Sequence, residues 1–357
     1  MLRPVCVLAV ILYRTVRLSS VWGCLVCGLL ATERRVVVLG TGGTIAGTGN
    51  DPLRAWAYQA AQLSVSQLVA VLPELADVPI ETHQVAQIDS KDMGWLVWRD
   101  LARALAQHLS RDDVAGVVIT HGTDTLEETS WLLHALHDGR KPVVLTAAMR
   151  PATAPDADGP RNLRDAVLVV QEAAERGEGG VWVQMHGKLW SAVDARKAHT
   201  HALDAFDGGG QLPLAEVIAG TDAERSSRRV SWSGPAPACK ALGWAVMERS
   251  LPRVELVCSH ADADGWLVHA MLAHSSATGH VLKGVVVACT GNGTLHTGLT
   301  DALRQATQQG VIVWRSSRVA RGGVLADAND EWPGVPHLTS VQARIALMLS
   351  IMGYPVL

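Results

Sequence analysis

The chain has 357 residues, of which 48% are hydrophobic and 18% charged, a composition typical of a globular protein with room for two domains or one large α/β domain. Its 31 Lys and Arg nearly balance 34 Asp and Glu, and no basic stripe is visible, which argues against nucleic acid as a partner. Six scattered cysteines do not suffice for a disulfide scaffold, and the 14 histidines form no recognisable ligand set, so we predict no metal site.

Residues 1–34 differ in character from the rest of the chain. Two apolar runs, 4–13 and 21–31, are separated by Arg14 and Arg17. Neither run reaches the roughly 20 apolar residues of a membrane span, so we predict none. The arginine break also fits a signal peptide poorly. We therefore interpret 1–34 as an N-terminal extension that is either signal-like or the product of a start assigned too far upstream. We expect a cytoplasmic protein, or a periplasmic one if the extension acts as a signal.

The first expected domain covers residues 35–220 and alternates buried-strand patterns with helical ones. Short, wholly apolar runs are typical of strands buried on both faces of a parallel sheet. They occur at 36–39, 116–120 and 142–146, and helical spacing occurs at 97–109, 126–137 and 162–174. Strands that alternate with helices predict βαβ units, a parallel sheet and helices on both of its faces. The fold class is therefore α/β.

A second, smaller α/β domain is expected over residues 249–357. A polar stretch rich in Gly and Ser, with three arginines, precedes it and is predicted to be part of a linker over 221–248. Beyond it, buried-strand patterns recur at 254–258, 284–288 and 310–314, with helical patterns at 299–309 and 340–352. The sequence therefore predicts a larger N-terminal parallel-sheet domain and a smaller C-terminal one.

The first strand is followed by an unusually glycine-rich loop, Gly40-Thr-Gly-Gly-Thr-Ile-Ala-Gly47. In open parallel sheets, ligands bind outside the carboxyl ends of the strands. Glycines there let the backbone approach a ligand closely and would present Thr44 on a tight turn. A dinucleotide or phosphate loop is the alternative. However, no acidic residue ends a second strand about 20 residues on, and no G-K-[ST] follows.

A second loop, Thr120-His-Gly-Thr-Asp-Thr-Leu-Glu-Glu128, follows another buried strand. It can be interpreted as the start of a helix, with Asp124 or Thr125 as the cap and Glu127 or Glu128 favourable to the helix dipole. That interpretation does not explain why Thr and Asp stand together at a strand end beside a glycine.

Taken together, the two loops resemble the signature motifs of the bacterial L-asparaginase family. The resemblance covers residues 35 to 350 and includes further motifs: KPVVLTAAMRP (141–151), DGPRNL (158–163), DARK (194–197), TGNGT (290–294) and SSRV (316–319). It implies hydrolysis of L-asparagine to L-aspartate and ammonia by a threonine nucleophile, through a covalent acyl-enzyme. Glutaminase-asparaginase or a related amidase is the alternative within the class. A non-catalytic amino-acid-binding homologue is the alternative outside it.

The resemblance also implies the catalytic residues. Thr44 matches the family's nucleophilic threonine, and Tyr58 matches a tyrosine beside it on a lid, although the lid sequence at 49–56 departs from the usual one. Thr123, Asp124 and Lys197 match a second Thr-Asp-Lys group. A threonine hydroxyl must lose its proton to a positioned acceptor, which a lysine can serve through Thr123 while Asp124 orients it. This chemistry requires no metal or organic cofactor.

Substrate binding is assigned in the same way. Gly43 lies in the glycine loop, where backbone amides can stabilise an oxyanion. Ser90 matches a serine that holds the substrate's α-carboxylate, although it could instead cap a helix. Lys91 follows it where many family members have Gln or Glu, which adds a cation near that carboxylate.

The resemblance further implies a homotetramer built from close dimers. In such an assembly a neighbouring subunit contributes an asparagine and an acidic residue to each site. Asn292 fits the asparagine, and the acidic residue would fall within 327–330 but is not assigned.

Overall fold

The computed structural model describes residues 34–49, 57–219, 228–325, 327 and 329–356. Residues 35–357 form one compact unit, separate from the first 34 residues. The extension predicted for 1–34 therefore lies outside the described residues except for Arg34, and so does most of the predicted lid.

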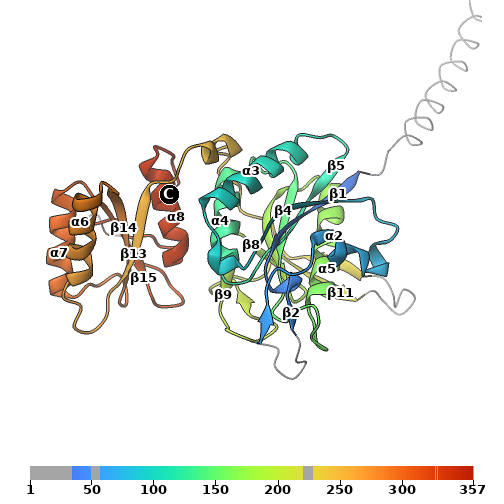
Figure 1. Ribbon diagram of the computed structural model, residues 1–357, viewed down its shortest axis with the longest axis horizontal. Helices are drawn as coiled ribbons and strands as arrows, with labels where there is room; N and C mark the ends of the chain where they lie inside the picture. Colours follow the sequence, from blue (N-terminus) through green and yellow to red (C-terminus); the bar gives the residue numbers. More distant parts are fainter. Residues whose placement is uncertain (1–33, 50–56, 220–227, 326, 328, 357) are drawn as a thin grey trace, which may run out of the picture. The chain divides into compact units, whose positions relative to one another are not determined.

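An eight-stranded sheet dominates this unit, with the strand order β12-β11-β8-β7-β6-β5-β1-β4 (Figure 1). Its strands are β1 (Arg35–Gly42), β4 (Ile80–Ile88), β5 (Val114–Thr120), β6 (Pro142–Thr146), β7 (Gly180–Met185), β8 (Lys188–Ser191), β11 (Ala215–Ala219) and β12 (Arg228–Trp232). The runs predicted at 36–39, 116–120 and 142–146 all lie in central strands of this sheet. Every residue of β5 and β6 is buried, as expected for strands covered on both faces.

The parallel arrangement holds for five of these strands, β4, β1, β5, β6 and β7. The other three continue the sheet in antiparallel fashion, because a tight turn after Met185 folds β8 back onto β7. The predicted parallel sheet is therefore correct for the part that carries the two polar loops and is extended by an antiparallel edge.

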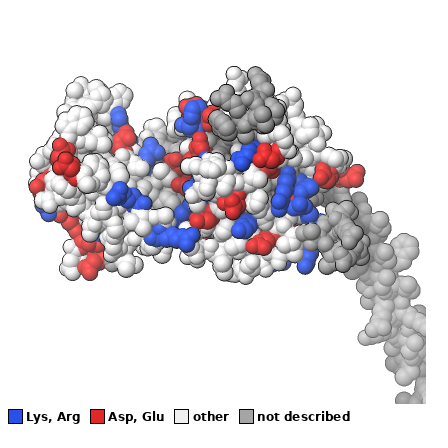
Figure 2. Space-filling model, turned by 90° about the horizontal axis from the view of Figure 1, so that it is seen from below, with Lys and Arg blue, Asp and Glu red and all other residues white. Residues whose placement is uncertain are grey.

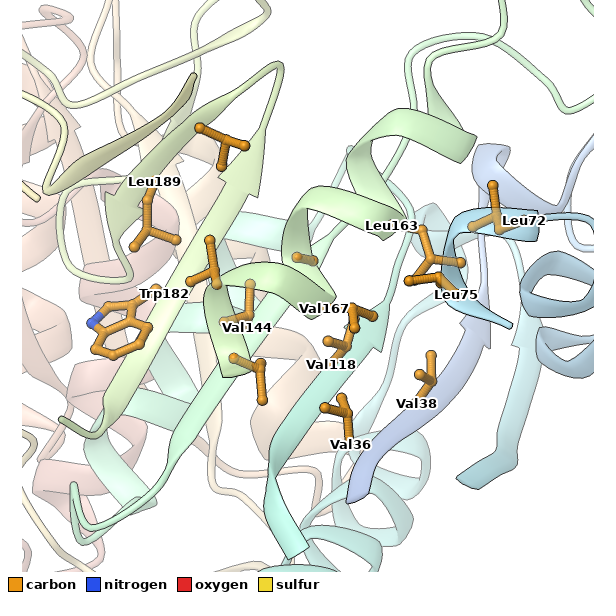
Figure 3. Close-up of a cluster of buried hydrophobic side chains, with 14 of the residues drawn as sticks. Val36, Val38, Leu72, Leu75, Val118, Val144, Leu163, Val167, Trp182 and Leu189 are labelled. Carbon is orange, nitrogen blue, oxygen red and sulfur yellow. The ribbon is translucent and has the colours of Figure 1, made fainter. Parts of the chain in front are cut away.

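Helices cover both faces of the large sheet. On one face, α2 (Val65–Ala70) and α5 (Gly159–Arg176) pack over alternate strand residues such as Val36, Val38 and Val118 (Figure 3). On the other face, α3 (Trp95–Leu109) and α4 (Leu126–Leu136) pack over the intervening residues, including Val37 and Leu39. Successive strand side chains point to opposite faces, so one apolar run contributes to two cores.

A smaller parallel sheet has the order β13-β14-β15, from strands Arg253–Cys258, Leu282–Cys289 and Ile312–Ser317. Helices α6 (Trp266–Thr278) and α7 (Thr297–Gln308) pack on one face, and α8 (Ser340–Ile351) packs on the other (Figure 1). This is the smaller α/β domain that the sequence predicts.

Part of the predicted linker is a strand. Residues 228–232 form β12 and pair with β11 at the edge of the large sheet. A 3-10 helix, η5 (Trp244–Glu248), occupies the end of the same stretch and contacts α3. The sequence pattern does not reveal this strand. Because β12 lies at the edge of the sheet, its side chains are partly exposed and polar residues are tolerated there. The domain boundaries at 220 and 248 stay predictions.

The surface carries both signs of charge. On the face seen in Figure 2, Lys and Arg side chains are interspersed with Asp and Glu. Among the described residues, no helix is both long and apolar enough to cross a membrane.

Candidate active site

Thr44 follows β1 directly, at the carboxyl edge of the parallel strands. Gly43 has φ +81° and precedes a single 3-10 turn, η1 (Thr44–Ala46), which leaves Thr44 only 8% exposed. The Gly43 amide donates to the Ile88 carbonyl at 2.9 Å, so the glycine loop is held against the end of β4. Thr44 is the first residue of its helical turn, where amides have no intrahelical acceptor.

The Thr44 hydroxyl contacts a phenol. Its Oγ1 lies 2.6 Å from the Tyr58 Oη, and either atom can be the donor. Tyr58 lies on β3 (Tyr58–Gln59), which pairs with β2 (Thr48–Gly49) in a short ladder. Burial raises the pKa of Tyr58, and the hydrogen bond from Thr44 opposes that shift. Tyr58 therefore carries its phenol proton at neutral pH.

A second polar group lies at the end of β5, the strand next to β1. Lys197 donates from Nζ to Thr123 Oγ1 at 2.9 Å and to Asp124 Oδ1 at 2.5 Å. Thr123 is buried, whereas the Asp124 side chain is 53% exposed. Lys197 comes from β9 (Arg196–Lys197), more than 70 positions along the chain, as the DARK motif predicts. Lys197 is therefore held within this group and is not a free surface lysine.

The two threonine loops are in direct backbone contact. A Cβ on Gly43 would lie 2.4 Å from the Gly122 Cα and N, and a Cβ on Gly122 would lie 2.4 Å from Ser90 Oγ. No side chain fits at either position. The glycines at 43 and 122 thus allow the ends of β1, β5 and β4 to meet, which brings Thr44, Thr123 and Ser90 to the same edge of the sheet.

Ser90 is buried and bonded to the second loop. Its Oγ accepts from the Asp124 amide at 3.3 Å, and its carbonyl accepts from Thr125 Oγ1 at 2.8 Å. Ser90 begins the short 3-10 helix η3 (Ser90–Asp92), whose N-cap is Asp89. The helix-cap interpretation of Ser90 is therefore wrong. Thr125 is the N-cap of α4, but its side chain makes no capping bond.

His121 supports the second loop from behind. Its ring is fully buried, with Nδ1 2.7 Å from the Gly122 carbonyl and Nε2 3.0 Å from Thr129 Oγ1. The Gly122 carbonyl can only accept, so Nδ1 of the neutral ring carries the proton and Nε2 accepts from the Thr129 hydroxyl, whose oxygen accepts from Trp98 at 2.9 Å. Burial lowers the pKa of His121 to about 4, which keeps the ring neutral.

Two acidic residues near the site have roles that the sequence did not reveal. Glu127 accepts from the Lys197 amide at 3.1 Å and from Thr339 Oγ1 at 3.4 Å, so it fixes the strand that carries Lys197. Burial raises its pKa. Asp89 pairs with Lys91 at 2.8 Å. The only sequence signal for these contacts is that both residues lie beside the motifs. The helix-start interpretation of Glu127 accounts for its charge but not for its contact with the Lys197 amide.

Lys91 and Asn292 are not joined to the threonine groups. The Lys91 side chain is 61% exposed and pairs with Asp89 and Asp92. Asn292 accepts from the Leu325 amide at 2.8 Å, and no described contact links it to Thr44 or Thr123. One chain therefore brings together Thr44 with Tyr58, and Thr123 with Asp124, Lys197 and Ser90. Within the described part of the chain, no cluster of three or more His, Cys, Asp or Glu residues could hold a metal ion.

Both domains match known families. Residues 35–231 match the family described as "Asparaginase, N-terminal", and residues 253–353 match "Glutaminase/Asparaginase C-terminal domain".

Individual proteins are similar over most of their length. A "Probable L-asparaginase periplasmic" of Haemophilus influenzae is 36% identical over 323 residues, which cover 88% of each chain. A "Glutaminase-asparaginase" of Pseudomonas fluorescens biotype A is 35% identical, covering 88% of this chain and 86% of that one. A crystal structure of a "Probable Cytoplasmic L-asparaginase" from Campylobacter jejuni superposes with a TM-score of 0.81 at 33% identity, covering 90% of this chain and 95% of the other.

Proposed function

Because this chain belongs to the asparaginase family, we propose that it hydrolyses the side-chain amide of L-asparagine to L-aspartate and ammonia, with Thr44 as the nucleophile. One observation carries the proposal. Two threonines at adjacent strand ends each have a different hydroxyl-activating partner, Tyr58 at 2.6 Å and Lys197 at 2.9 Å. An amidohydrolase that forms an acyl-enzyme and then hydrolyses it requires a hydroxyl nucleophile with neighbours that can transfer its proton.

In the first step, Thr44 Oγ1 attacks the side-chain amide carbon. The threonine proton leaves through its hydrogen-bonded neighbours to the amide nitrogen, ammonia departs, and an ester to Thr44 is left. The amide of Thr44, at the start of η1, and that of Thr123 are candidate donors to the oxyanion. The Gly43 amide does not fill this role, since it already donates to Ile88. Water then cleaves the ester, which returns the threonine and releases the β-carboxylate of aspartate.

Tyr58 acts as a neutral partner in this scheme. A phenol whose pKa is raised by burial keeps its proton at neutral pH. It can accept a hydrogen bond from Thr44 or pass a proton along, but it supplies no negative charge. The hydrogen bond of 2.6 Å supports a role in orienting the nucleophile for attack.

The second group, Thr123 with Asp124 and Lys197, contains the charged side chains that bond to one of the two threonines. Lys197 Nζ hydrogen-bonds to both Thr123 and Asp124, which gives the Thr123 proton a path. As Thr123 Oγ1 accepts a proton from the attacking hydroxyl or from the hydrolytic water, its own proton passes to Lys197, which passes one of its protons to the Asp124 carboxylate. Asp124 has an exposed carboxylate that can also pair with the substrate's α-ammonium.

Recognition of the α-carboxylate is proposed for Ser90, whose hydroxyl lies beside the Asp124 amide. Lys91 is proposed to add a cation near it, weakened by its pairing with Asp89 and Asp92. Asn292 would then act on the site of a neighbouring subunit. This requires an oligomer, for which we propose a homotetramer of close dimers. Its mass in solution, measured by light scattering, tests that assembly.

Glutamine is the second candidate substrate, because similar proteins carry the names L-asparaginase and glutaminase-asparaginase at nearly the same identity. One additional methylene changes pocket binding by only about 1–3 kcal/mol. The test is ammonia release by the purified chain without added cofactor, with asparagine and glutamine in parallel. We expect a higher kcat/KM for asparagine. No release from either amide, despite a folded protein, would identify a non-catalytic homologue.

The compartment is proposed to be the cytoplasm, with the periplasm as the alternative. Similar proteins are named for both compartments. Cell fractionation with mass spectrometry of the mature N-terminus distinguishes them, because an exported form would both lose most of residues 1–34 and lie in the periplasmic fraction.

A further inference from the structure

A cleft of about 390 Å³ lies away from the Thr44 group, between the large and small sheets. One wall comes from the start of α3 and the first turn of α4, and the other from the residues entering β13 and from α8. Its volume falls within the range of small-molecule sites. Of the residues proposed for the hydrolysis, Lys91 lines this space, whereas Thr44, Thr123 and Ser90 do not.

The floor of the cleft is apolar. Trp95 and Trp98 contribute from α3, Met348 from α8, and Leu251 from the segment before β13. Trp98 is nearly fully buried and packs in the core between the two sheets. Such a floor favours a ligand with a hydrocarbon or aromatic body.

Arg344 is the cation that remains available in this cleft. Its Nε donates to the Val254 carbonyl at 2.9 Å, but its terminal nitrogens donate no hydrogen bond within the described chain. Its approach to Glu128 is 4.0 Å, too long for a hydrogen bond. The other cations of the lining are already paired, Lys91 with Asp89 and Arg253 with Glu255.

Glu128 does not neutralise Arg344 fully. Burial raises the pKa of Glu128 to about 7, and neighbouring Glu127 adds to the shift, whereas Arg344 opposes it. At neutral pH this carboxyl therefore carries less negative charge than an exposed carboxylate does. A protonated Glu128 can also donate a hydrogen bond to an anion.

We propose that this cleft binds a small monocarboxylate with an apolar body, its carboxylate on Arg344 and its body against Trp95 and Trp98. A planar guanidinium holds a carboxylate in a bidentate manner. A doubly charged anion is disfavoured, because two carboxylates, Glu128 and Glu255, also line the cleft. An amine is disfavoured, because the three cations of the lining outnumber these two carboxylates.

The test uses the full chain and two probes of the same size, hexanoate and hexylamine, titrated by calorimetry. Hexanoate is expected to bind with a Kd in the millimolar range or tighter, and hexylamine at least tenfold more weakly, a difference of about 1.4 kcal/mol. Arg344→Gln should weaken hexanoate binding at least tenfold. The matched control is Arg304→Gln, an exposed arginine of α7 that pairs with Glu331, which should leave binding unchanged.

A second variant guards against a fold defect in Arg344→Gln. Leu251→Trp fills the cleft without changing charge and should also abolish hexanoate binding, while a thermal unfolding scan confirms that each variant is folded. Glu128→Gln should tighten binding at pH 8, where the wild-type carboxylate repels the probe. The proposal is overturned if hexanoate shows no saturable binding up to roughly 20 mM. It is also overturned if hexylamine binds as well as hexanoate, or if Arg344→Gln and Leu251→Trp both leave Kd unchanged. None of these outcomes depends on amide hydrolysis.

Discussion

The two threonine loops occupy equivalent places in the fold, each after a central parallel strand, yet their surroundings differ. Thr44 is buried against the neutral phenol of Tyr58, and no charged group among the described residues hydrogen-bonds to its hydroxyl. Thr123 touches a lysine that is itself paired with an exposed carboxylate. The two hydroxyls therefore cannot be interchangeable. When neighbouring groups of one kind have different environments, they take different chemical roles.

The fold brings the two threonine loops close together, and the hydrogen-bond partner of each threonine determines its chemical properties. The glycines at 43 and 122 bring the loops into contact, and neither position tolerates a side chain. Thr44, whose partner is neutral, is suited to form a covalent bond. Thr123, whose partner is a cation, is suited to hold and transfer a proton. The predictions below separate these roles.

The largest effect is expected for the nucleophile. Thr44→Ala removes the attacking oxygen, so kcat should fall by about 10⁴ or more, equivalent to roughly 5.5 kcal/mol in the barrier. Thr44→Ser keeps a hydroxyl and should recover much of the loss. Steady-state ammonia release measures both variants. If Thr44→Ala kept more than about a tenth of the wild-type rate, the assignment of the nucleophile would be wrong.

Substitutions of Thr123 and Lys197 should lower kcat less than loss of Thr44 does, and by similar amounts. Thr123→Val and Lys197→Met should each lower kcat by about 10³, or roughly 4 kcal/mol, because either change breaks the same 2.9 Å contact. Residues that act as a unit are non-additive, so the double variant should be little worse than either single one. Fully multiplicative losses would show that Thr123 and Lys197 act independently.

Acid should weaken the fold through the support of the second loop. His121 has its pKa lowered to about 4 by burial, so the unfolded chain, with a value near 6.5, binds more protons between these limits. The free energy of unfolding should therefore decrease as pH falls from 6.5 to 4, by at most about 3 kcal/mol from this residue. His121→Gln should flatten that part of the profile, measured by urea unfolding. His134 and His137, also buried with pKa values of about 4, add to the slope that remains, whereas Glu128, whose pKa is raised to about 7, opposes it. A slope identical to that of the wild type would contradict the prediction.

Tyr58→Phe removes the phenol hydroxyl that contacts Thr44 and so tests the role of that contact. Loss of the 2.6 Å contact should lower kcat by about 10², or roughly 2.7 kcal/mol, with little change in KM. The raised pKa of Tyr58 also predicts that no phenolate ionisation appears in the kcat profile between pH 6 and 9. Loss of a titration in that range on mutation to Phe would indicate that Tyr58 acts as a base.

Lys91 should have the smallest effect. Succinamate lacks the α-ammonium of asparagine, so its binding depends more than that of asparagine on a cation near the α-carboxylate. Lys91→Gln should therefore raise discrimination against succinamate by about fivefold, or roughly 1 kcal/mol, limited by the pairing of Lys91 with Asp89 and Asp92. The ratio of kcat/KM for the two substrates measures it. A change of less than about threefold would exclude Lys91 from the substrate site.

The sequence predicted the central strands and their helices well, because short apolar runs rich in β-branched residues, such as Val117 to Ile119, are typical of buried parallel strands. It missed β4, an edge strand in which no residue is fully buried and polarity follows no simple period. It also missed the antiparallel edge, whose strands are short. Among site contacts, the motifs indicated Lys197 and Ser90, but the Glu127 contact to the Lys197 amide depends on tertiary structure that no spacing encodes.

The central claim is that Thr44, and not Thr123, forms the covalent bond. The direct measurement is peptide mass spectrometry after incubation with an asparagine analogue that carries an electrophilic carbon in place of the side-chain amide. We predict one added label per chain, on the peptide containing Thr44, and no label in Thr44→Ala. In Lys197→Met the label should still reach Thr44, only more slowly. A label on Thr123 in the wild-type chain would contradict the account.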